Sequence, residues 1–546
     1  MPAASSYNRP LPNAFGYNES YDIVGGPPAV IKPLVELEMT RLSADLRRKP
    51  MWWTKFRDQE ILARWRAEAI SQARLMKESH VDYILQELDG YANLRDEQSG
   101  AEVSCYDRIW QSDELIPSVL RQRLITGVAK LENVPEAEKD WHPRSNGQVL
   151  DLVHPSLYPI VYDRTLAYPK YSEVRNPDDL KPCGRPLFGD TSPNAYYNSK
   201  HFQWLPTDFI VSNDSKSVES DGYINNLHPD EHSELHKTIE ELIAAYIPLF
   251  ERALTDSIPE NNVVPERTNN TYSYDDGGYP GKDYFRDYEE WYNNRPIILP
   301  QVVKGGYVPG ILEQRKIQYT LAGRTIQVIV KLANIHLTPV KPTYAGGSWH
   351  IEGMINESIA VSGIYYYDEE NITESRLAFR TAVECPMDCE QSDERGCKLT
   401  WGIGRDDPCV NELGSVITSQ HRCIAFPNTY QHRVSPFELA DKTKPGHRKI
   451  LALFLVDPAT RRTSTKFVPP QQREWRTSAI TANPVLKAAF EKLAPELVTK
   501  IDSMAEGLMT RQEAEAYRLE LMDERKAYVG QSNEKWFMAP FDLCEH

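Results

Sequence analysis

The chain has 546 residues, of which 40% are hydrophobic, and a formal net charge of −16 at pH 7. This length and composition exclude general disorder and allow one large domain or two to three domains. The acidic charge argues against a nucleic-acid-binding surface, because neutralising phosphates requires clustered Lys and Arg. We therefore expect a small molecule or a protein as substrate.

The first twenty residues contain no basic segment followed by an apolar run, so the sequence predicts no signal peptide. No stretch approaches the eighteen apolar residues of a membrane helix. The eight cysteines fit free thiols in a reducing compartment better than a disulfide framework. We expect a cytoplasmic protein without a membrane partner, and the choice between monomer and homodimer stays open.

The N-terminal region, residues 1–140, begins with an arm of about 50 residues rich in Pro, Gly and Asn. Helical periodicity then predicts helices over 54–79, 83–94 and 115–131. A long apolar stripe predicts a strong helix over 231–255. The polar, acidic and aromatic stretch 256–298 has no period, so we expect an irregular loop, either over a site or on the surface. Helices over 484–509 and 510–528 form a C-terminal extension, residues 479–546.

The β-rich core occupies residues 141–478 together with the long helix and the irregular loop. Runs rich in β-branched and aromatic residues predict its strands, at 326–337, 359–367, 377–380, 414–417, 422–426 and 449–456. Several short strands separated by turn residues favour a sandwich or an open barrel. The predicted fold class is therefore α+β.

His350, Glu352 and, about eighty residues later, His432 form the most informative set of side chains. On a strand residues two apart share a face, whereas on a helix they point about 200° apart, so His350 and Glu352 can act together only on a strand. The preceding glycines, Gly346 and Gly347, allow a close approach of backbone. Two imidazoles and a carboxylate can bind one face of Fe(II), or less favourably Mn or Zn, and leave positions open. Zinc hydrolases also use two His and one Glu, so the ligands alone leave the reaction open.

Arg448 follows His432 by sixteen residues, at the head of a predicted strand. Its guanidinium can bind a carboxylate through two hydrogen bonds. Both faces of this strand are apolar, so the pattern does not distinguish Arg448 from Lys449. We prefer Arg448 for its planar donor group, with a surface ion pair as the alternative interpretation.

Four cysteines lie within 25 residues, and only the first pair has the spacing of a zinc site. We expect reduced thiols in a loop rather than zinc, although the sequence leaves zinc open. These residues are Cys385, Cys389, Cys397 and Cys409.

The chain resembles a large, mostly fungal family of uncharacterised proteins within the Fe(II)/2-oxoglutarate-dependent oxygenase superfamily, from about residue 20 to 540. The motifs that carry this resemblance are Tyr223-Ile224-Asn225-Asn226-Leu227-His228-Pro229, Trp349-His350-Ile351-Glu352-Gly353-Met354, Tyr365-Tyr366-Tyr367-Asp368, Phe426-Pro427-Asn428, Gln431-His432-Arg433-Val434 and Leu455-Val456-Asp457-Pro458.

The resemblance implies a double-stranded β-helix, or jelly-roll, core flanked by N-terminal and C-terminal helices. It also implies His350, Glu352 and His432 as the catalytic iron ligands and Arg448 as the residue that binds 2-oxoglutarate. Many superfamily members have Asp where this chain has Glu352. The implied reaction uses O2, converts 2-oxoglutarate to succinate and CO2, and oxidises a C–H bond, by hydroxylation or else by desaturation or ring formation.

We expect an oxygenase that acts on a small molecule such as an amino acid or a secondary-metabolite intermediate. A protein hydroxylase or demethylase with the same metal site is one alternative, and it would need a long groove for a peptide. A non-catalytic β-helix binding protein is another, but it would have no need of all four site residues. Residues near the metal motif are candidate substrate contacts, with core packing the competing interpretation for the two aromatic ones; they are Trp349, Asn356, Glu357 and Tyr366.

Overall fold

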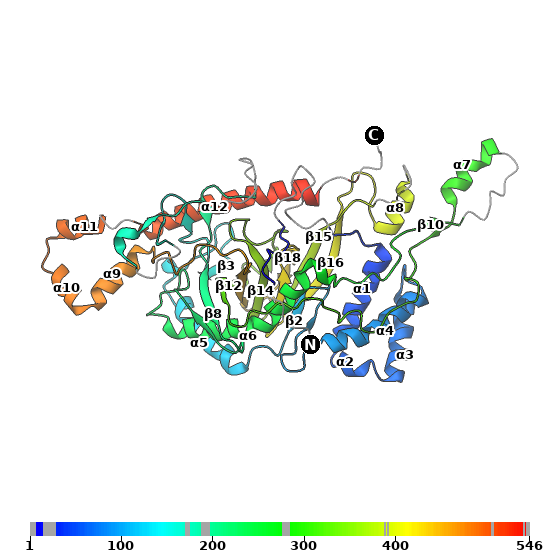
Figure 1. The fold of residues 1–546 in the computed structure, drawn as a ribbon, viewed down its shortest axis with the longest axis horizontal. Helices are drawn as coiled ribbons and strands as arrows, with labels where there is room; N and C mark the ends of the chain where they lie inside the picture. Colours follow the sequence, from blue (N-terminus) through cyan, green and yellow to red (C-terminus); the bar gives the residue numbers. More distant parts are fainter. Residues whose placement is uncertain are drawn as a thin grey trace.

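The chain folds into antiparallel sheets with helices packed around them, an α+β architecture (Figure 1). The computed structural model describes residues 7–14, 29–169, 175–186, 197–275, 284–386, 389, 393–503, 507–538 and 541. The α-helices are α1 (Leu34–Arg47), α2 (Trp52–Lys55), α3 (Gln59–Gln72), α4 (Glu78–Leu94), α5 (Ser118–Glu132), α6 (Ser233–Ser257), α7 (Tyr284–Asn294), α8 (Glu394–Trp401), α9 (Arg473–Ala482), α10 (Pro484–Phe490), α11 (Pro495–Ser503) and α12 (Arg511–Ser532).

Nine of the described strands form one large sheet, in the order β1-β2-β17-β14-β20-β12-β8-β9, with β3 also paired to β12. Its members are β1 (Glu102–Val103), β2 (Trp110–Ser112), β3 (Val149–Val153), β8 (Thr207–Val211), β9 (Val218–Ser220), β12 (Thr325–Leu337), β14 (Ile359–Glu370), β17 (Cys423–Pro427) and β20 (Gly446–Val456). A smaller sheet has the order β16-β15-β18, with bounds Val410–Ile417, Arg376–Ala382 and Gln431–Val434.

Four further strand pairs decorate these sheets. They are β4 (Ile160–Val161) with β7 (Phe202–Gln203), β5 (Leu166–Ala167) with β6 (Lys181–Pro182), β10 (Ser273–Tyr274) with β11 (Ile297–Ile298), and β13 (Thr343–Tyr344) with β19 (Phe437–Glu438).

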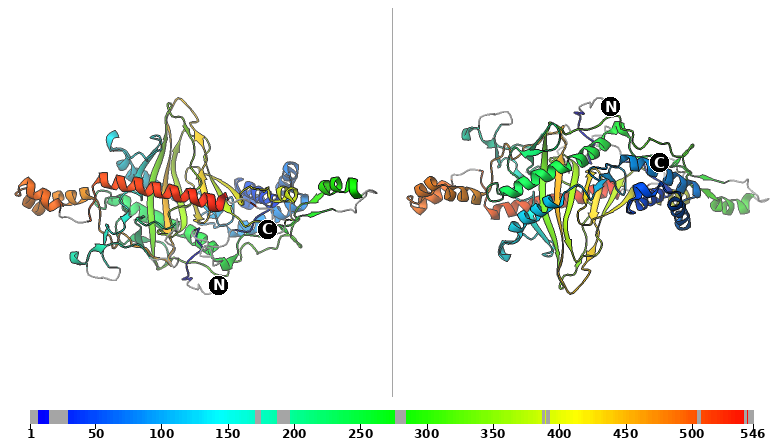
Figure 2. Two further views of the ribbon diagram at one scale, coloured as in Figure 1. Left: turned by 90° about the horizontal axis from the view of Figure 1, so that it is seen from above. Right: turned by 90° about the horizontal axis from the view of Figure 1, so that it is seen from below.

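Both faces of the large sheet are buried. Leu451, Leu453 and Leu455 of β20 belong to the core shared with α5 and α6, which cross the sheet (Figure 2). Ala452 and Phe454 face the other way and pack with residues of the small sheet. Because side chains alternate between faces along a strand, such a strand is apolar at nearly every position. The predicted strands in this part of the chain are confirmed.

The two sheets face each other across a second core. Phe379 of β15 packs against Phe426 of β17 with ring centroids 4.9 Å apart, and Leu377 and Ile364 belong to the same cluster. The described strands do not close into a barrel. The α+β class is confirmed, whereas the jelly-roll core and the boundaries near residues 140 and 478 stay predictions.

The predicted helix over 231–255 is confirmed as α6, and those over 83–94, 115–131 and 510–528 are confirmed as α4, α5 and α12, but two other helix predictions were wrong. The N-terminal arm contains α1, whose apolar stripe is weak because Glu36, Thr40 and Arg47 are buried with it. The predicted helix over 54–79 is interrupted between α2 and α3, and the one over 484–509 is divided into α10 and α11. Residues 1–6 and 15–28 of the arm lie outside the described residues.

The stretch 256–298 is not simply irregular, because it contains β10, α7 and β11. Helix α7 has an aromatic rather than an aliphatic stripe, in which Tyr288 stacks on Tyr292. Residues 276–283 lie outside the described residues. None of the helices that the structure describes combines the length and the apolar character needed to span a bilayer.

Gly363 marks the closest approach of β14 to α6, and it gives a test of this packing. A Cβ atom added there would lie 2.9 Å from a Tyr246 ring carbon and 3.0 Å from a Phe250 ring carbon. Such overpacking typically costs about 1–3 kcal/mol. We therefore expect Gly363→Ala to lower the free energy of unfolding by about this amount, measured by urea denaturation.

The neighbouring Ser362 provides a matched control, because its side chain points to the opposite face of β14. Its buried hydroxyl has no hydrogen-bond partner among the described residues. We expect Ser362→Ala to leave the stability unchanged or to raise it slightly. Equal stability of Gly363→Ala and the unmodified protein would contradict the packing of α6 on β14.

Candidate active site

The backbone holds His350 and His432 side by side. The His350 N–H donates to the His432 carbonyl at 3.2 Å, and the His432 N–H donates to the His350 carbonyl at 3.0 Å. Gly346 allows this approach, since it has a φ of 88° and a Cβ there would lie 2.7 Å from the Val434 carbonyl oxygen. The imidazole centroids are consequently 4.5 Å apart.

The two segments are extended to different degrees. His432 is the second residue of β18, whereas His350 lies in an isolated bridge and Glu352 in a bend. The prediction that His350 and Glu352 share a strand is therefore wrong. Asn428 replaces the missing strand contacts, because its side chain accepts from the Glu352 N–H at 2.9 Å and donates to the Glu352 carbonyl at 2.8 Å.

Glu352 nevertheless points between the two imidazoles. Its Oε1 lies 3.6 Å from the His350 Nε2 and 3.4 Å from the His432 Nε2. The His350 Nδ1 lies 2.8 Å from the Ser348 carbonyl oxygen and can donate to it. A hydrogen on Nδ1 leaves the Nε2 lone pair free for a cation. One ligand atom from each residue lies within 4.8 Å of the others, so this group can hold a metal ion.

The protonation states of Glu352 and His432 favour metal binding. Burial alone would raise the pKa of Glu352, but the two adjacent imidazoles hold this pKa well below its ordinary value. Burial lowers the pKa of His432. For His350 the Glu352 carboxylate outweighs burial and raises the pKa. An ionised carboxylate beside a neutral imidazole is a donor set that divalent metals bind.

Arg448 is buried in the interior between the sheets. Its Nη1 donates to the Ser375 and Thr418 hydroxyls at 3.2 and 3.3 Å, and its guanidinium lies 5.4 Å from the Tyr366 ring centroid. No carboxylate of the described residues lies within 4.0 Å of it, and its buried Nε has no hydrogen-bond partner there. Burial lowers the pKa of this guanidinium. A buried cation without a counter-ion is costly unless an anion binds it.

Lys449, the alternative to Arg448, has a different environment. It lies on the opposite face of β20, where its Nζ is 3.0 Å from Glu132 and 3.6 Å from Asp368. The sequence could not distinguish the two residues because both faces of β20 are apolar. The structure brings only Arg448 into the interior.

One further cation inside this region was missed in the sequence. Lys331 of β12 lies opposite Ala452, on the same strand face as Ile329, a residue of the core between the sheets. Its charge opposes protonation of His350. In the sequence, Lys331 could have been identified as a lysine within a largely apolar predicted strand.

Two of the candidate substrate contacts have partners within the protein. Glu357 accepts from the Trp204 and Met354 backbone N–H groups and pairs with Arg525 at 2.7 Å. The side chain of Asn356 accepts from the Ser199 N–H. These polar groups are already used within the protein, and a substrate contact by either residue stays a prediction.

The two aromatic candidates contact arginines. Trp349 lies under the guanidinium groups of Arg380 and Arg433, at 4.7 and 4.5 Å. Tyr366 packs beneath Arg448. The core-packing interpretation is confirmed for Tyr366, which belongs to the cluster between the sheets, whereas Trp349 is only half-buried and belongs to none of the hydrophobic clusters of the described residues.

His142, Asp151 and His154 form a second group with the composition of a metal site. Arg518 already neutralises Asp151 and also binds Asp140 at 2.7 Å. The His154 Nδ1 accepts the Ser156 N–H at 3.2 Å, so the hydrogen of its neutral ring is on Nε2 and no lone pair remains. This group is better explained as an ion-paired cluster that fixes α12.

The four clustered cysteines behave differently from the prediction. Cys389 and Cys397 form a disulfide, so the prediction of free thiols was wrong for these two. The Cys385 and Cys409 sulfurs lie 3.3 Å apart without a bond. In the described part of the chain these cysteines do not form a metal-binding group.

Three solved structures are similar to parts of this chain, with TM-scores too low to assign a fold or a function. A selenomethionine-labelled Fe(II)/α-ketoglutarate-dependent dioxygenase, TqaL, is 9% identical with a TM-score of 0.24, over 75% of this chain and 90% of that one. A bsmA homologue from Methylobium petroleophilum PM1 is 11% identical with a TM-score of 0.14, over 25% and 43%. IDO from Bacillus thuringiensis is 8% identical with a TM-score of 0.21, over 46% and 73%.

The family comparison covers most of the chain, whereas no curated protein matches it. The model of an N-terminal domain of unknown function, DUF4246_N, matches residues 3–68. The model described as a protein of unknown function, DUF4246, matches residues 78–479, including all four predicted site residues. The chain therefore belongs to the DUF4246 family.

Proposed function

We propose that the protein is an Fe(II)- and 2-oxoglutarate-dependent oxygenase of a small molecule, with its two facing sheets forming a double-stranded β-helix. The observation that carries this proposal is the pairing of a His/Glu/His group with a buried guanidinium that lacks a carboxylate. Both adjoin one apolar cluster, since His432 packs on Phe426 at 4.9 Å and Arg448 lies over Tyr366.

His350, Glu352 and His432 would hold the iron on one face and leave the remaining positions open. Arg448 would bind a carboxylate of 2-oxoglutarate through its planar pair of N–H groups, with the Ser375 and Thr418 hydroxyls fixing the guanidinium. Iron and 2-oxoglutarate, when bound, supply the oxidation of a C–H bond by O2. The apolar side chains around Phe426 would exclude water from this chemistry.

The metal site is tested by anaerobic titration of the metal-free protein with Fe(II) and 2-oxoglutarate. We expect a weak visible charge-transfer band, which arises when 2-oxoglutarate chelates the iron through two oxygens. His350→Ala should lose the band because one of the ligands is gone. His142→Ala is the matched control, since it removes a histidine from the second His/Asp/His group, and it should retain the band.

Absence of the band in the unmodified protein, together with bound zinc or no metal, would overturn the oxygenase proposal. A zinc-loaded protein would favour a hydrolase, and a protein without metal would favour a binding function. Equal loss of the band in His350→Ala and His142→Ala would place the iron elsewhere. A positive result would justify a search for the substrate by succinate release.

A further inference from the structure

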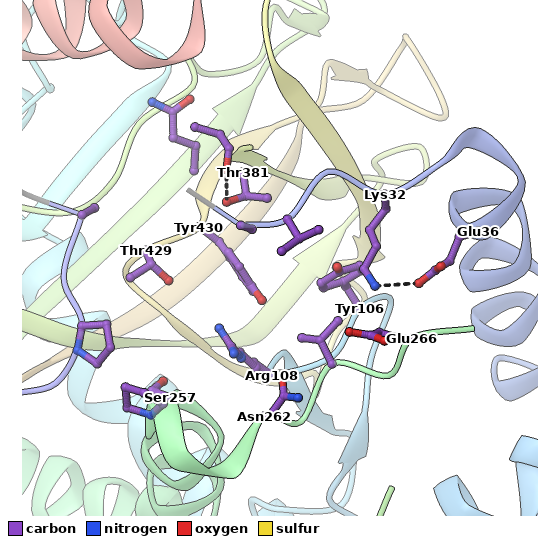
Figure 3. A pocket seen from close by; sticks show the side chains of 18 of the residues that line it. Lys32, Glu36, Tyr106, Arg108, Ser257, Asn262, Glu266, Thr381, Thr429 and Tyr430 are labelled. Carbon is purple, nitrogen blue, oxygen red and sulfur yellow. Dashed lines mark hydrogen bonds and ion pairs between the residues drawn. The ribbon is translucent and has the colours of Figure 1, made fainter. Parts of the chain in front are cut away.

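A cavity of about 590 Å³, shown in Figure 3, has in its wall residues that are adjacent in sequence to the candidate metal ligands. Its walls come from residues 12–14 and 29–36, from residues 257–270 after α6, and from the start of β18. Ile351, between the two metal-motif residues, and Gln431, just before His432, are part of the wall. The volume is that of a typical small-molecule site. The first half of the stretch predicted as an irregular loop therefore helps to form a cavity.

Two of the four charged residues that line the cavity neutralise each other. Lys32 and Glu36 form an ion pair at 2.8 Å at one end of the cavity (Figure 3). Glu36 also accepts from the Thr268 N–H and hydroxyl at 3.2 and 2.8 Å. Glu266 is exposed. An anionic ligand would gain little from Lys32, because that charge is balanced.

Arg108 is different, because no carboxylate of the described residues lies within 4.0 Å of it. Its buried Nε also has no hydrogen-bond partner there. Figure 3 shows its side chain reaching into the cavity between Asn262 and Tyr430. A guanidinium placed in this way provides parallel N–H donors for one carboxylate.

The remaining wall combines polar side chains, among them Asn262 and Thr429, with an aromatic and apolar surface. Tyr106 and Tyr430 make an edge-to-face pair with centroids 6.1 Å apart, and Val30, Val264 and Ile351 add aliphatic surface. Such a surface suits a flat or branched apolar group. Tyr430 precedes His432 by two residues, so their Cα atoms are at most about 7 Å apart.

We propose that this cavity binds the substrate, a small molecule with one carboxylate held by Arg108 and an apolar body packed on Tyr106 and Tyr430. The proposal rests on the proposed oxygenase function, which supplies the metal site next to the cavity. Among the described residues, Arg108 is the one cation of the cavity lining without an ion pair, which argues for a monocarboxylate rather than a dicarboxylate. The volume of about 590 Å³ argues for a small molecule rather than a peptide.

The test uses ω-phenylalkanoates, from phenylacetate to 6-phenylhexanoate, and the corresponding amides as probes on the full chain. Saturation-transfer NMR without metal should detect the acids and not the amides. Arg108→Met should weaken binding of the acids roughly 10- to 100-fold, as expected for loss of a charge-assisted hydrogen bond. Arg108→Lys, which keeps the charge, should retain part of the affinity, and thermal unfolding should show that both variants are folded.

A second measurement asks whether the bound probe lies beside the metal. Mn(II) added with 2-oxoglutarate should broaden the resonances of the bound acid, and it should not do so in His350→Ala. Three results would overturn the proposed role of the cavity. They are binding of acids and amides alike, unchanged affinity in Arg108→Met, and no binding of any acid. A third outcome is that the acids bind through Arg108 but Mn(II) does not broaden their resonances, in a protein that gives the expected Fe(II) band. The cavity would then not be the substrate site, while the oxygenase proposal would stand.

Discussion

Arg448→Met is expected to weaken 2-oxoglutarate binding by at least about 30-fold while leaving Fe(II) binding intact. Removing one partner of a buried charge pair typically costs about 2–5 kcal/mol of binding free energy. The same change should stabilise the protein in the absence of 2-oxoglutarate, by on the order of 1 kcal/mol or more, because it removes a buried cation without a counter-ion. Anaerobic calorimetric titration and thermal unfolding measure the two effects.

Lys449→Met is the matched control, since this residue is adjacent on β20 and faces the opposite side. It loses ion pairs with Glu132 and Asp368, so its stability should fall slightly while its affinity for 2-oxoglutarate stays unchanged. The opposite signs of the two stability changes are the specific result expected. If Arg448→Met destabilised the protein and bound 2-oxoglutarate normally, Arg448 would be a structural residue.

Arg267→Met is expected to lower the free energy of unfolding by about 3–5 kcal/mol, the usual cost of breaking a buried ion pair from one side. Arg267 binds Glu87 of α4 at 2.9 Å, with the two side chains 1% and 0% exposed. It also donates to the Tyr91 hydroxyl at 2.9 Å and to the Thr40 hydroxyl of α1 at 3.4 Å. Burial already raises the pKa of Glu87, and Arg267 opposes that rise. Without Arg267, the Glu87 carboxylate would be stranded.

Chemical denaturation of two further variants identifies the cause. Arg123→Met breaks an exposed pair between α5 and α6, Arg123 with Glu241, and should cost only about 0.2–1 kcal/mol. Adding Glu87→Gln to Arg267→Met should recover part of the lost stability, because no charge is then stranded. A cost for Arg267→Met as small as that for Arg123→Met would show that the pair does not join the helices to the rest of the fold.

The sequence predicted the central strands well because each is apolar, rich in β-branched residues and bounded by turns. It predicted α6 for a similar reason, since one side of that helix is uniformly apolar. It failed at α1, where Glu36 and Arg47 are buried through specific partners and interrupt the apolar stripe. Sequence periodicity reports the burial of apolar side chains, so a helix that buries charged residues is not detected by it.

In the candidate site, too, some residues could be identified from the sequence pattern and others only from their partners in the fold. His350, Glu352, His432 and Arg448 are distinctive residue types in a recognisable order, and the structure brings the first three together and buries the fourth between the sheets. Arg108 had no sequence signal, because its significance depends on the absence of a nearby carboxylate. The disulfide between Cys389 and Cys397 depends in the same way on how a loop is folded. The three-dimensional arrangement of the chain decides all of these features.

The mutual backbone hydrogen bonds of His350 and His432 have a consequence for how a metal would be exchanged. They set the separation of the two segments without any help from a cation, and Asn428 fixes Glu352 in the same way. The entropy lost in ordering the ligands is therefore paid during folding rather than at the moment of binding. A chelator should remove the metal from a protein that remains folded, and reloading should require no refolding step.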